Sequence, residues 1–390
     1  MGIEIIRKKD MFCYETAFST ICNYFNVPYQ MLFSHTWCYD YNGADLCIGN
    51  NIIINDWELF DKMRKLGIEE MIDKVDAKDV TYIRSMLEQE QIAIIRMDMM
   101  KFNEINGTSY MGMYSPYLLY DYDDEFIAYD LHYTHENIKI SEELFQNACS
   151  NICFYGVENK NVSFAFEYDL EDLQKILIPH KPNFEKIEQL ARLFADGAVD
   201  LKYETKDLSE RDNPVYALLI NKIETLARGR NLFSMYLDYI NSMISEIDIE
   251  EESEKMAYWA GKWNLVKVIL IKAFLKKDFE QDVMKKVALI IFEIAKGEKE
   301  LYEQLLSVRT NNKEIDNKYL KLNNKLTQYE VNVVRIDLTN KYNNAGIKIA
   351  GTDKKADMLF GKVSVRVHFE QICQMSHMHG SNLFWRRCFF

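Results

Sequence analysis

The sequence predicts an α+β fold in its N-terminal part, followed by a helical middle region and a short C-terminal β segment. Residues 92–97, Ile-Ala-Ile-Ile-Arg-Met, form a continuous apolar run that is typical of a buried central strand. Two aromatic-rich runs, 117–122 and 125–130, are separated by two aspartates and predict a β-hairpin in an antiparallel sheet. From residue 183 onward, apolar residues recur instead with the period of an α-helix.

Composition changes mark the boundaries between these regions. We expect a first domain over residues 1–158 and a linker over 159–182, because two prolines close that segment. The helical periodicity of residues 183–328 predicts a bundle of about five helices. Residues 329–390 alternate only partly like strands and end in an atypical aromatic tail, so we expect an incomplete β-sandwich-like segment there.

The composition excludes several classes of protein. The 390 residues carry a formal net charge of −13, whereas a protein that mainly binds nucleic acid needs a basic surface to contact phosphates. No apolar stretch reaches the roughly 20 residues of a membrane span, and the N-terminal segment lacks the apolar core of a signal peptide. We therefore expect a cytoplasmic protein with no nucleic-acid or membrane partner.

Neither the cysteines nor the acidic residues form a metal-binding pattern. The eight cysteines lack a repeated CxxC pair, so we expect reduced thiols. Cys149 and Cys153 could be half of a zinc site, but no second ligand pair follows at a suitable spacing. The acidic run at 244–255 lacks the alternating oxygen ligands and glycine turn of a calcium loop. We expect no cofactor and no metal, and we interpret this run as a solvated helix start.

The segment with the most chemical character is residues 10–25, which read as a loop followed by a helix. Cys13 comes at the helix N-terminus, where unpaired N–H groups and the helix dipole lower the pKa of a thiol. A nucleophilic thiolate needs this placement. The alternative is a cysteine that only packs as the helix begins.

A thiol nucleophile needs a general base, usually a histidine that a carboxylate or amide orients. His132 and His135 follow the predicted hairpin directly, and Asp130 ends its second strand. The candidate catalytic set is therefore Cys13, Asp130, His132 and His135. Each histidine could instead be a surface or core residue, and Asp130 could simply end the strand.

Several segments together resemble the N-terminal domain of the butirosin biosynthesis protein H family. The resemblance covers roughly residues 5–158 and is spread over many positions rather than concentrated in one motif. It rests on the cysteine that opens the helix, on Asn26-Val27-Pro28-Tyr29, on His35-Thr36-Trp37-Cys38-Tyr39, and on residues 94–98, 117–124, 128–130 and 140–144.

The resemblance implies a papain-like fold of the cysteine-peptidase type. It also implies acyl transfer from a carrier-protein thioester to an amine, forming an amide in the biosynthesis of an antibiotic of the nonribosomal peptide or polyketide class. The implied partners are an acyl or peptidyl carrier protein and a small amine acceptor. The residue that matches the family nucleophile is Cys13, and the matching acid is Asp130.

One departure from the family pattern affects the expected activity. Members that look catalytic carry histidine at the start of the strand that here reads Ser115-Pro116-Tyr117. His132 or His135 could supply the base instead, or the base could be lost. Loss would leave a binding or carrier-docking module, in which we expect Tyr117 to face the thiol. A cysteine peptidase is a further alternative.

Docking of a carrier protein would require local positive charge, because carrier proteins are usually acidic. Arg7-Lys8-Lys9 beside Cys13 and the run Lys62-Met63-Arg64-Lys65 are the candidates. Both runs could also be ordinary solvated faces of the protein.

Overall fold

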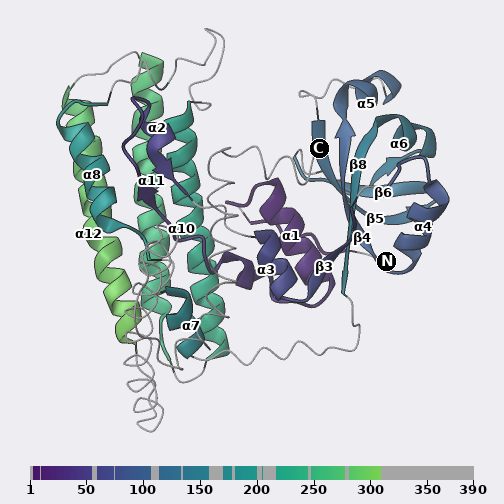
Figure 1. Cartoon of the computed structure of the whole chain (residues 1–390), viewed down its shortest axis with the longest axis horizontal. Coiled ribbons are helices and arrows are strands. Elements are labelled where there is room, and N and C mark those ends of the chain that lie inside the picture. The colour runs from purple at the N-terminus through teal and green to yellow at the C-terminus, as the bar shows by residue number, and fades with distance from the viewer. Residues whose placement is uncertain are drawn as a thin grey trace, which may run out of the picture. The chain divides into compact units, whose positions relative to one another are not determined.

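The computed structural model describes residues 3–8, 10–54, 59–73, 75–106, 114–132, 135–157, 170–177, 181–199, 204, 217–244, 247–276 and 281–308. The chain divides into two compact units, residues 1–309 and 310–390. The predicted mixed architecture is confirmed, because an N-terminal antiparallel sheet with helices is followed by a helical region (Figure 1). The predicted β segment at 329–390 lies outside the described residues.

The main sheet has six strands in the order β3-β8-β4-β5-β6-β7, and all neighbours pair antiparallel. The apolar run at 92–97 becomes β4, which lies between β8 and β5, and the aromatic runs form the β5–β6 hairpin, so both predictions are confirmed. Asp124 turns the hairpin with a φ of 59°, a left-handed conformation that aspartate tolerates. The strands are β3 (Ile68–Asp73), β4 (Ile92–Asp98), β5 (Tyr114–Asp123), β6 (Glu125–Asp130), β7 (Ile138–Ile140) and β8 (Cys149–Val157).

One face of this sheet carries the apolar core. Because side chains alternate along a strand, the paired residues Ile95 and Tyr117 point to the same face, and both are fully buried. Helices α4 (Val80–Glu88), α5 (Met99–Asn106) and α6 (Glu142–Ala148) pack on this face through their apolar residues. The ring centroids of Phe126 and Phe145 lie 4.2 Å apart, so the hairpin and α6 share one core.

Two other helices cover the opposite face, α1 (Cys13–Tyr24) and α3 (Leu59–Lys65). Phe18 of α1 and Phe60 of the α3 segment both pack edge-on against Tyr155, with ring centroids 6.2 and 6.5 Å away. Tyr155 pairs with Ile92, so it points away from the core that α4, α5 and α6 cover. The sheet is therefore enclosed between two helical layers (Figure 1).

The helical region contains α7 (Leu170–Leu177), α8 (Phe184–Ala195), α10 (Leu218–Met243), α11 (Glu250–Lys276) and α12 (Gln281–Ser307). The helical period that begins at 183 is confirmed: Asn183 caps α8, and its side chain accepts a hydrogen bond from the Lys186 N–H. Helix α7 falls inside the segment that the sequence predicted to be a linker. None of the described helices is both long enough and apolar enough to cross a membrane.

Residues that follow α1 pack against this helical region rather than against the sheet. They form the 3₁₀ helix η1 (Tyr29–Phe33), a two-stranded sheet of β1 (Asp40–Tyr41) and β2 (Ile52–Ile53), and the short helix α2 (Ile48–Asn51). The Thr36 hydroxyl donates to the Gly229 carbonyl of α10 at 2.8 Å. These contacts join the N-terminal part to the helical region within the compact unit of residues 1–309.

Candidate functional site

Cys13 is the first residue of α1, as the sequence predicts. Phe12 precedes it in an extended conformation, and its N–H donates to the Glu15 side chain at 3.0 Å. A carboxylate in the first turn satisfies an N–H that the helix leaves unpaired, and it interacts favourably with the helix dipole. The sequence Phe12-Cys13-Tyr14-Glu15 therefore begins the helix at the cysteine.

The surroundings of the Cys13 thiol raise its pKa to about 11. Burial is the largest cause, because a thiolate loses hydration there, and the nearby Glu15 carboxylate adds to it. Backbone N–H groups and the Arg228 guanidinium lower the pKa by less. The N–H groups at the start of α1 do lower the pKa of Cys13, but burial outweighs them.

Arg228 reaches the start of α1 from α10. Its Nε lies 3.3 Å from Glu15 Oε1, and its guanidinium carbon lies 3.7 Å from the centre of the Phe12 ring. One turn further along α10, Asn231 Nδ2 donates to Asp10 Oδ2 at 2.9 Å. The loop before α1 and the first turn of α1 are thus held to α10 by an ion pair, a ring contact and a hydrogen bond.

Asp130 and the two candidate histidines lie together at the end of β6. The fully buried Asp130 accepts a hydrogen bond from the backbone N–H of His132 at 2.8 Å, and its own N–H donates to the His135 carbonyl at 2.9 Å. Both histidines are exposed. These hydrogen bonds shape the chain that leaves the hairpin, and both involve the backbone of the histidines rather than their rings.

The Asp130 side chain lies on the face of the sheet opposite to α1, which carries Cys13. Asp130 pairs with Tyr117, so the pleat directs it to the face that α4, α5 and α6 cover, whereas α1 packs on the opposite face. Within the described part of the chain, the side-chain charges that act on the thiol are those of Glu15 and Arg228.

Tyr117 does not take the place of a missing histidine beside the thiol. Its hydroxyl lies 4.0 Å from Met99 Sδ, and its ring stacks on Phe102 with the centroids 6.0 Å apart. Tyr117 is fully buried in the core under α5. The prediction that it faces Cys13 is therefore wrong, because that prediction ignored the side to which the pleat directs position 117.

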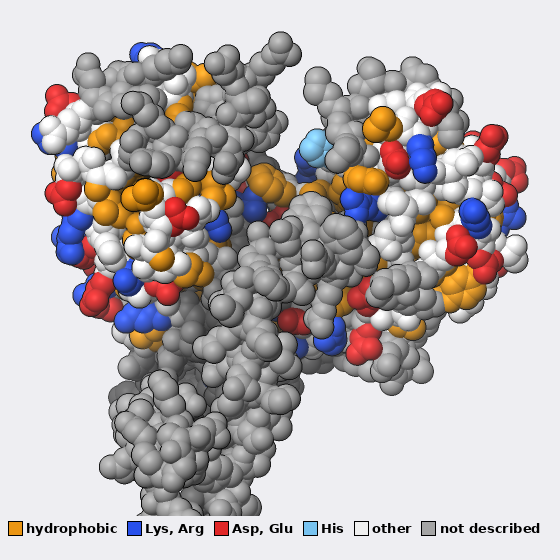
Figure 2. Space-filling model, turned by 45° about the horizontal axis from the view of Figure 1, so that its top comes forward, with side chains coloured by type: hydrophobic (Ala, Val, Ile, Leu, Met, Phe, Trp, Pro, Cys, Tyr) orange, Lys and Arg blue, Asp and Glu red, His pale blue; other side chains and the backbone are white. Residues whose placement is uncertain are grey.

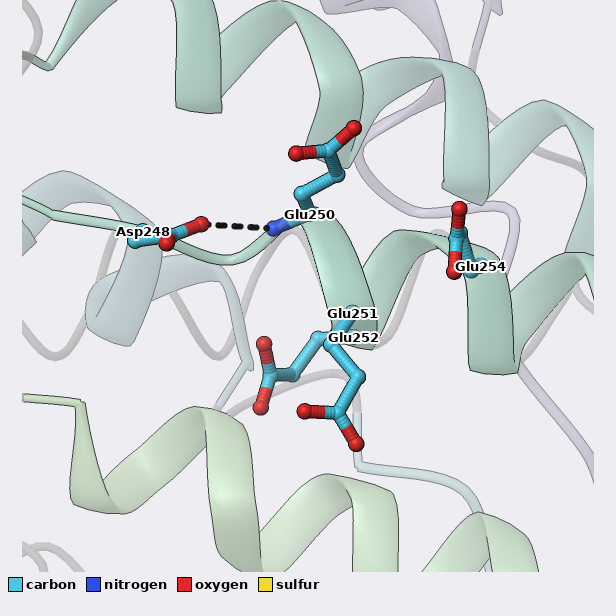
Figure 3. A pocket seen from close by; sticks show the side chains of 5 residues that line it. All are labelled: Asp248, Glu250, Glu251, Glu252 and Glu254. Atoms are coloured by element: carbon cyan, nitrogen blue, oxygen red, sulfur yellow. Dashed lines mark hydrogen bonds between the residues drawn. The ribbon is translucent and has the colours of Figure 1, made fainter.

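A pocket lined by five carboxylates lies at the start of α11 (Figure 3). Asp248 Oδ1 accepts a hydrogen bond from the Glu250 N–H at 3.3 Å, while the other side chains point in different directions (Figure 3). Among the residues that the structure describes, no group of three or more His, Cys, Asp or Glu side chains could hold a metal ion. Acidic residues at a helix start interact favourably with its dipole, which accounts for this pocket.

Sequence reasoning missed the residues that surround Cys13. Glu15 carries a recognisable signal, because a glutamate three residues after a helix cap often accepts the cap N–H. Arg228 and Asn231 belong to a helix far along the chain, and nothing in the local pattern of α10 indicates that they contact the loop before α1.

Two comparisons with known proteins yielded no relative of this chain. A scan against models of protein families found no match, and a search of curated proteins found no similar sequence. The resemblance to the butirosin biosynthesis protein H family therefore rests on the residues quoted above.

Proposed function

We propose that this chain is a cytoplasmic, papain-like relative of the butirosin biosynthesis protein H family that docks an acyl or peptidyl carrier protein without turnover. The observation that carries the proposal is the ion pair of Glu15 and Arg228 beside the Cys13 thiol, at the place where a catalytic thiol usually has a histidine. The resemblance over residues 5–158 supplies the carrier protein as the partner.

The pKa of Cys13 supports binding over catalysis. With a pKa of about 11, roughly one thiol in ten thousand is ionised at pH 7. A catalytic site offsets such a loss with a positioned general base, which is worth about 10²–10⁴ in rate. A thioester bound beside this thiol would therefore stay intact on the timescale of docking.

Two small basic surfaces are candidates for the contact with an acidic carrier. Arg7 and Lys8 are exposed just before α1, and Arg64 and Lys65 are exposed at the end of α3. Lys62, which the sequence grouped with them, is buried and donates to the Ser34 hydroxyl, so it is unavailable to a partner. In the view of Figure 2, Lys and Arg side chains are mixed with acidic ones over the described surface.

Acyl transfer to an amine is the second candidate. The position of Cys13 at the N-terminus of α1, with Arg228 able to lower the pKa of its thiol, favours it. In this hypothesis His132 or His135 moves to the thiol when the carrier binds. Catalytic hydrogen bonds are often assembled only in the substrate complex.

One experiment separates the two candidates. A carrier protein loaded with an acyl thioester is mixed with the wild-type chain, with Cys13→Ala and with the matched control Cys153→Ala, and covalent adducts are followed by intact mass. We expect carrier binding to survive Cys13→Ala, with no acyl adduct in any variant. Arg64→Glu with Lys65→Glu should weaken that binding.

Other outcomes would assign a different activity. An acyl adduct on wild type and Cys153→Ala but absent from Cys13→Ala, with amide appearing when an amine is added, would establish the transferase. Cleavage of an added peptide that depends on Cys13 would establish a cysteine peptidase. An absence of carrier binding across several acyl groups would overturn the docking proposal.

A further inference from the structure

Helix α11 carries a row of exposed apolar side chains along one side, and the Tyr258 hydroxyl at its start donates to Glu293 of α12 at 3.3 Å. The exposed fractions are 51% for Tyr258, 44% for Leu265, 40% for Val268 and 65% for Leu275. The opposite side of the helix, which includes Met256, Ala260, Trp263, Val266 and Leu270, is fully buried. We call the exposed positions Tyr258, Gly261, Leu265, Val268, Lys272 and Leu275 the α11 stripe.

The spacing of the α11 stripe is that of a helix–helix interface. Successive members are three and four residues apart in strict alternation, which is the period that two packed helices share. Exposed apolar residues that are scattered singly need no explanation, but four of them on one side of a single helix indicate a contact surface. The stripe spans 17 residue steps, which is roughly 26 Å along the helix axis.

We propose that the α11 stripe binds the same stripe of a second copy of this chain, with the two helices antiparallel. A two-fold axis between Leu265 and Val268 places each member opposite another member, as such an interface requires. Leu265 then meets Val268 of the second copy, and Tyr258 meets Leu275.

The third pair in this register explains the two members that are not apolar. Gly261 meets Lys272 of the second copy. No atom of the structure lies within 4 Å of the position that a Cβ on Gly261 would occupy, so the glycine leaves a gap over the helix. The aliphatic stem of a lysine fits such a gap while its ammonium group stays in water.

The charge distribution along α11 favours two antiparallel copies. Its first turns carry four glutamates at positions 250, 251, 252 and 254, its last turn carries Lys276, and Lys272 lies one residue before that turn. Antiparallel pairing brings the acidic end of each helix to the basic end of the other, and it opposes the two helix dipoles favourably. Parallel pairing would place acid against acid. Because the charges at the two ends match each other, a second copy fits this face.

The test is the oligomeric state of the full chain, measured by sedimentation velocity over a range of concentrations. A single-helix contact is small compared with the roughly 1,200–2,000 Å² of a stable interface, so we expect a weak, concentration-dependent dimer. Leu265→Glu places a charge in each central contact and should weaken dimerisation on the order of a hundredfold. The matched control Leu46→Glu changes a leucine that is 71% exposed elsewhere, and it should dimerise like wild type.

A second variant and a disulfide cross-link test the same antiparallel pairing. Lys272→Glu alters only a polar surface position, so it should fold normally yet weaken the dimer, most strongly at low salt. A mixture of Leu265→Cys and Val268→Cys chains should form a disulfide between these two positions, identified by peptide mass. The proposal would be overturned if the wild type stays monomeric at high micromolar concentration, or if neither Leu265→Glu nor Lys272→Glu weakens the dimer. It would also be overturned if the Leu265→Cys chain cross-links mainly to itself.

Discussion

Arg230 of α10 and Glu298 of α12 form a two-pronged ion pair in which both side chains are completely buried. Arg230 Nε and Nη2 each donate to a different carboxylate oxygen at 2.9 Å. Trp263 of α11 and Trp37 of the N-terminal part donate their indole N–H groups to the same carboxylate at 2.9 and 2.8 Å. Because four donors satisfy one carboxylate, three helices and a distant loop are fixed at a single point.

We predict that Arg230→Met destabilises the protein by about 3–5 kcal/mol, because it leaves the Glu298 charge buried without its cation. Urea unfolding followed by circular dichroism measures the change in the free energy of unfolding. The control is Lys255→Met, which removes an exposed ion pair with Glu251 and should cost at most about 1 kcal/mol. Equal effects for the two variants would show that the buried pair does not stabilise the fold.

A second prediction concerns the attachment of the N-terminal part to the helices. Trp37→Phe keeps most of the aromatic packing but removes the N–H that donates to Glu298, so we expect a loss of about 1–3 kcal/mol. Hydrogen exchange of the residues that follow η1 should become faster, because Trp37 holds this loop to α12. Unchanged exchange in that segment would contradict the assigned role of Trp37.

The sheet and the helical region were predictable because their signals are local. A buried strand and a hairpin can be seen in six or seven consecutive residues, as in β4 and the β5–β6 pair. The contact of Trp37 with Glu298 has no such signal, because it joins two segments that are far apart in sequence. For this reason the sequence could not predict that the sheet and the helical region lie within one compact unit, residues 1–309.

In the candidate site, too, only the features with a local sequence signal were predictable. The sequence predicted that Cys13 opens a helix, since capping patterns are local. The pKa of its thiol depends on how deeply the thiol is buried, and on Arg228, which comes from a helix of the other region. The direction of the Asp130 side chain, away from α1, follows from the pleat of β6. A one-residue change in strand register would turn this side chain to the other face of the sheet.

We predict that Cys13 reacts slowly with iodoacetamide at neutral pH and faster as the pH rises toward about 11. Because burial and Glu15 raise the pKa, Glu15→Gln should lower it and speed alkylation, whereas Arg228→Gln should raise it further and slow alkylation. Peptide mass spectrometry resolves Cys13 from the other thiols. Rapid alkylation of Cys13 at pH 7 in the folded protein would contradict the assigned pKa.

The same pKa predicts a pH dependence of stability. A pKa that is higher in the folded state means that folding favours the protonated thiol. The resulting stabilisation is complete below the ordinary pKa near 9 and is lost as the pH rises through about 11. The difference in the free energy of unfolding between wild type and Cys13→Ala should therefore shift in favour of the variant over this interval, as measured by urea unfolding at each pH.

The last prediction compares two glycines in neighbouring helices. A Cβ on Gly297 of α12 would lie 1.8 Å from the Trp259 ring of α11, so Gly297→Ala must displace that ring. Overpacking costs about 1–3 kcal/mol, which exceeds the gain of about 1 kcal/mol in helix propensity, so we expect a net loss near 1 kcal/mol. Gly261→Ala meets open space and should instead stabilise the protein by about 0.5–1 kcal/mol. Thermal unfolding at a low protein concentration, where the proposed dimer dissociates, measures the stability of both variants. We expect the two changes in stability to have opposite signs. A stabilised Gly297→Ala would mean that α11 and α12 are not in close contact at Trp259.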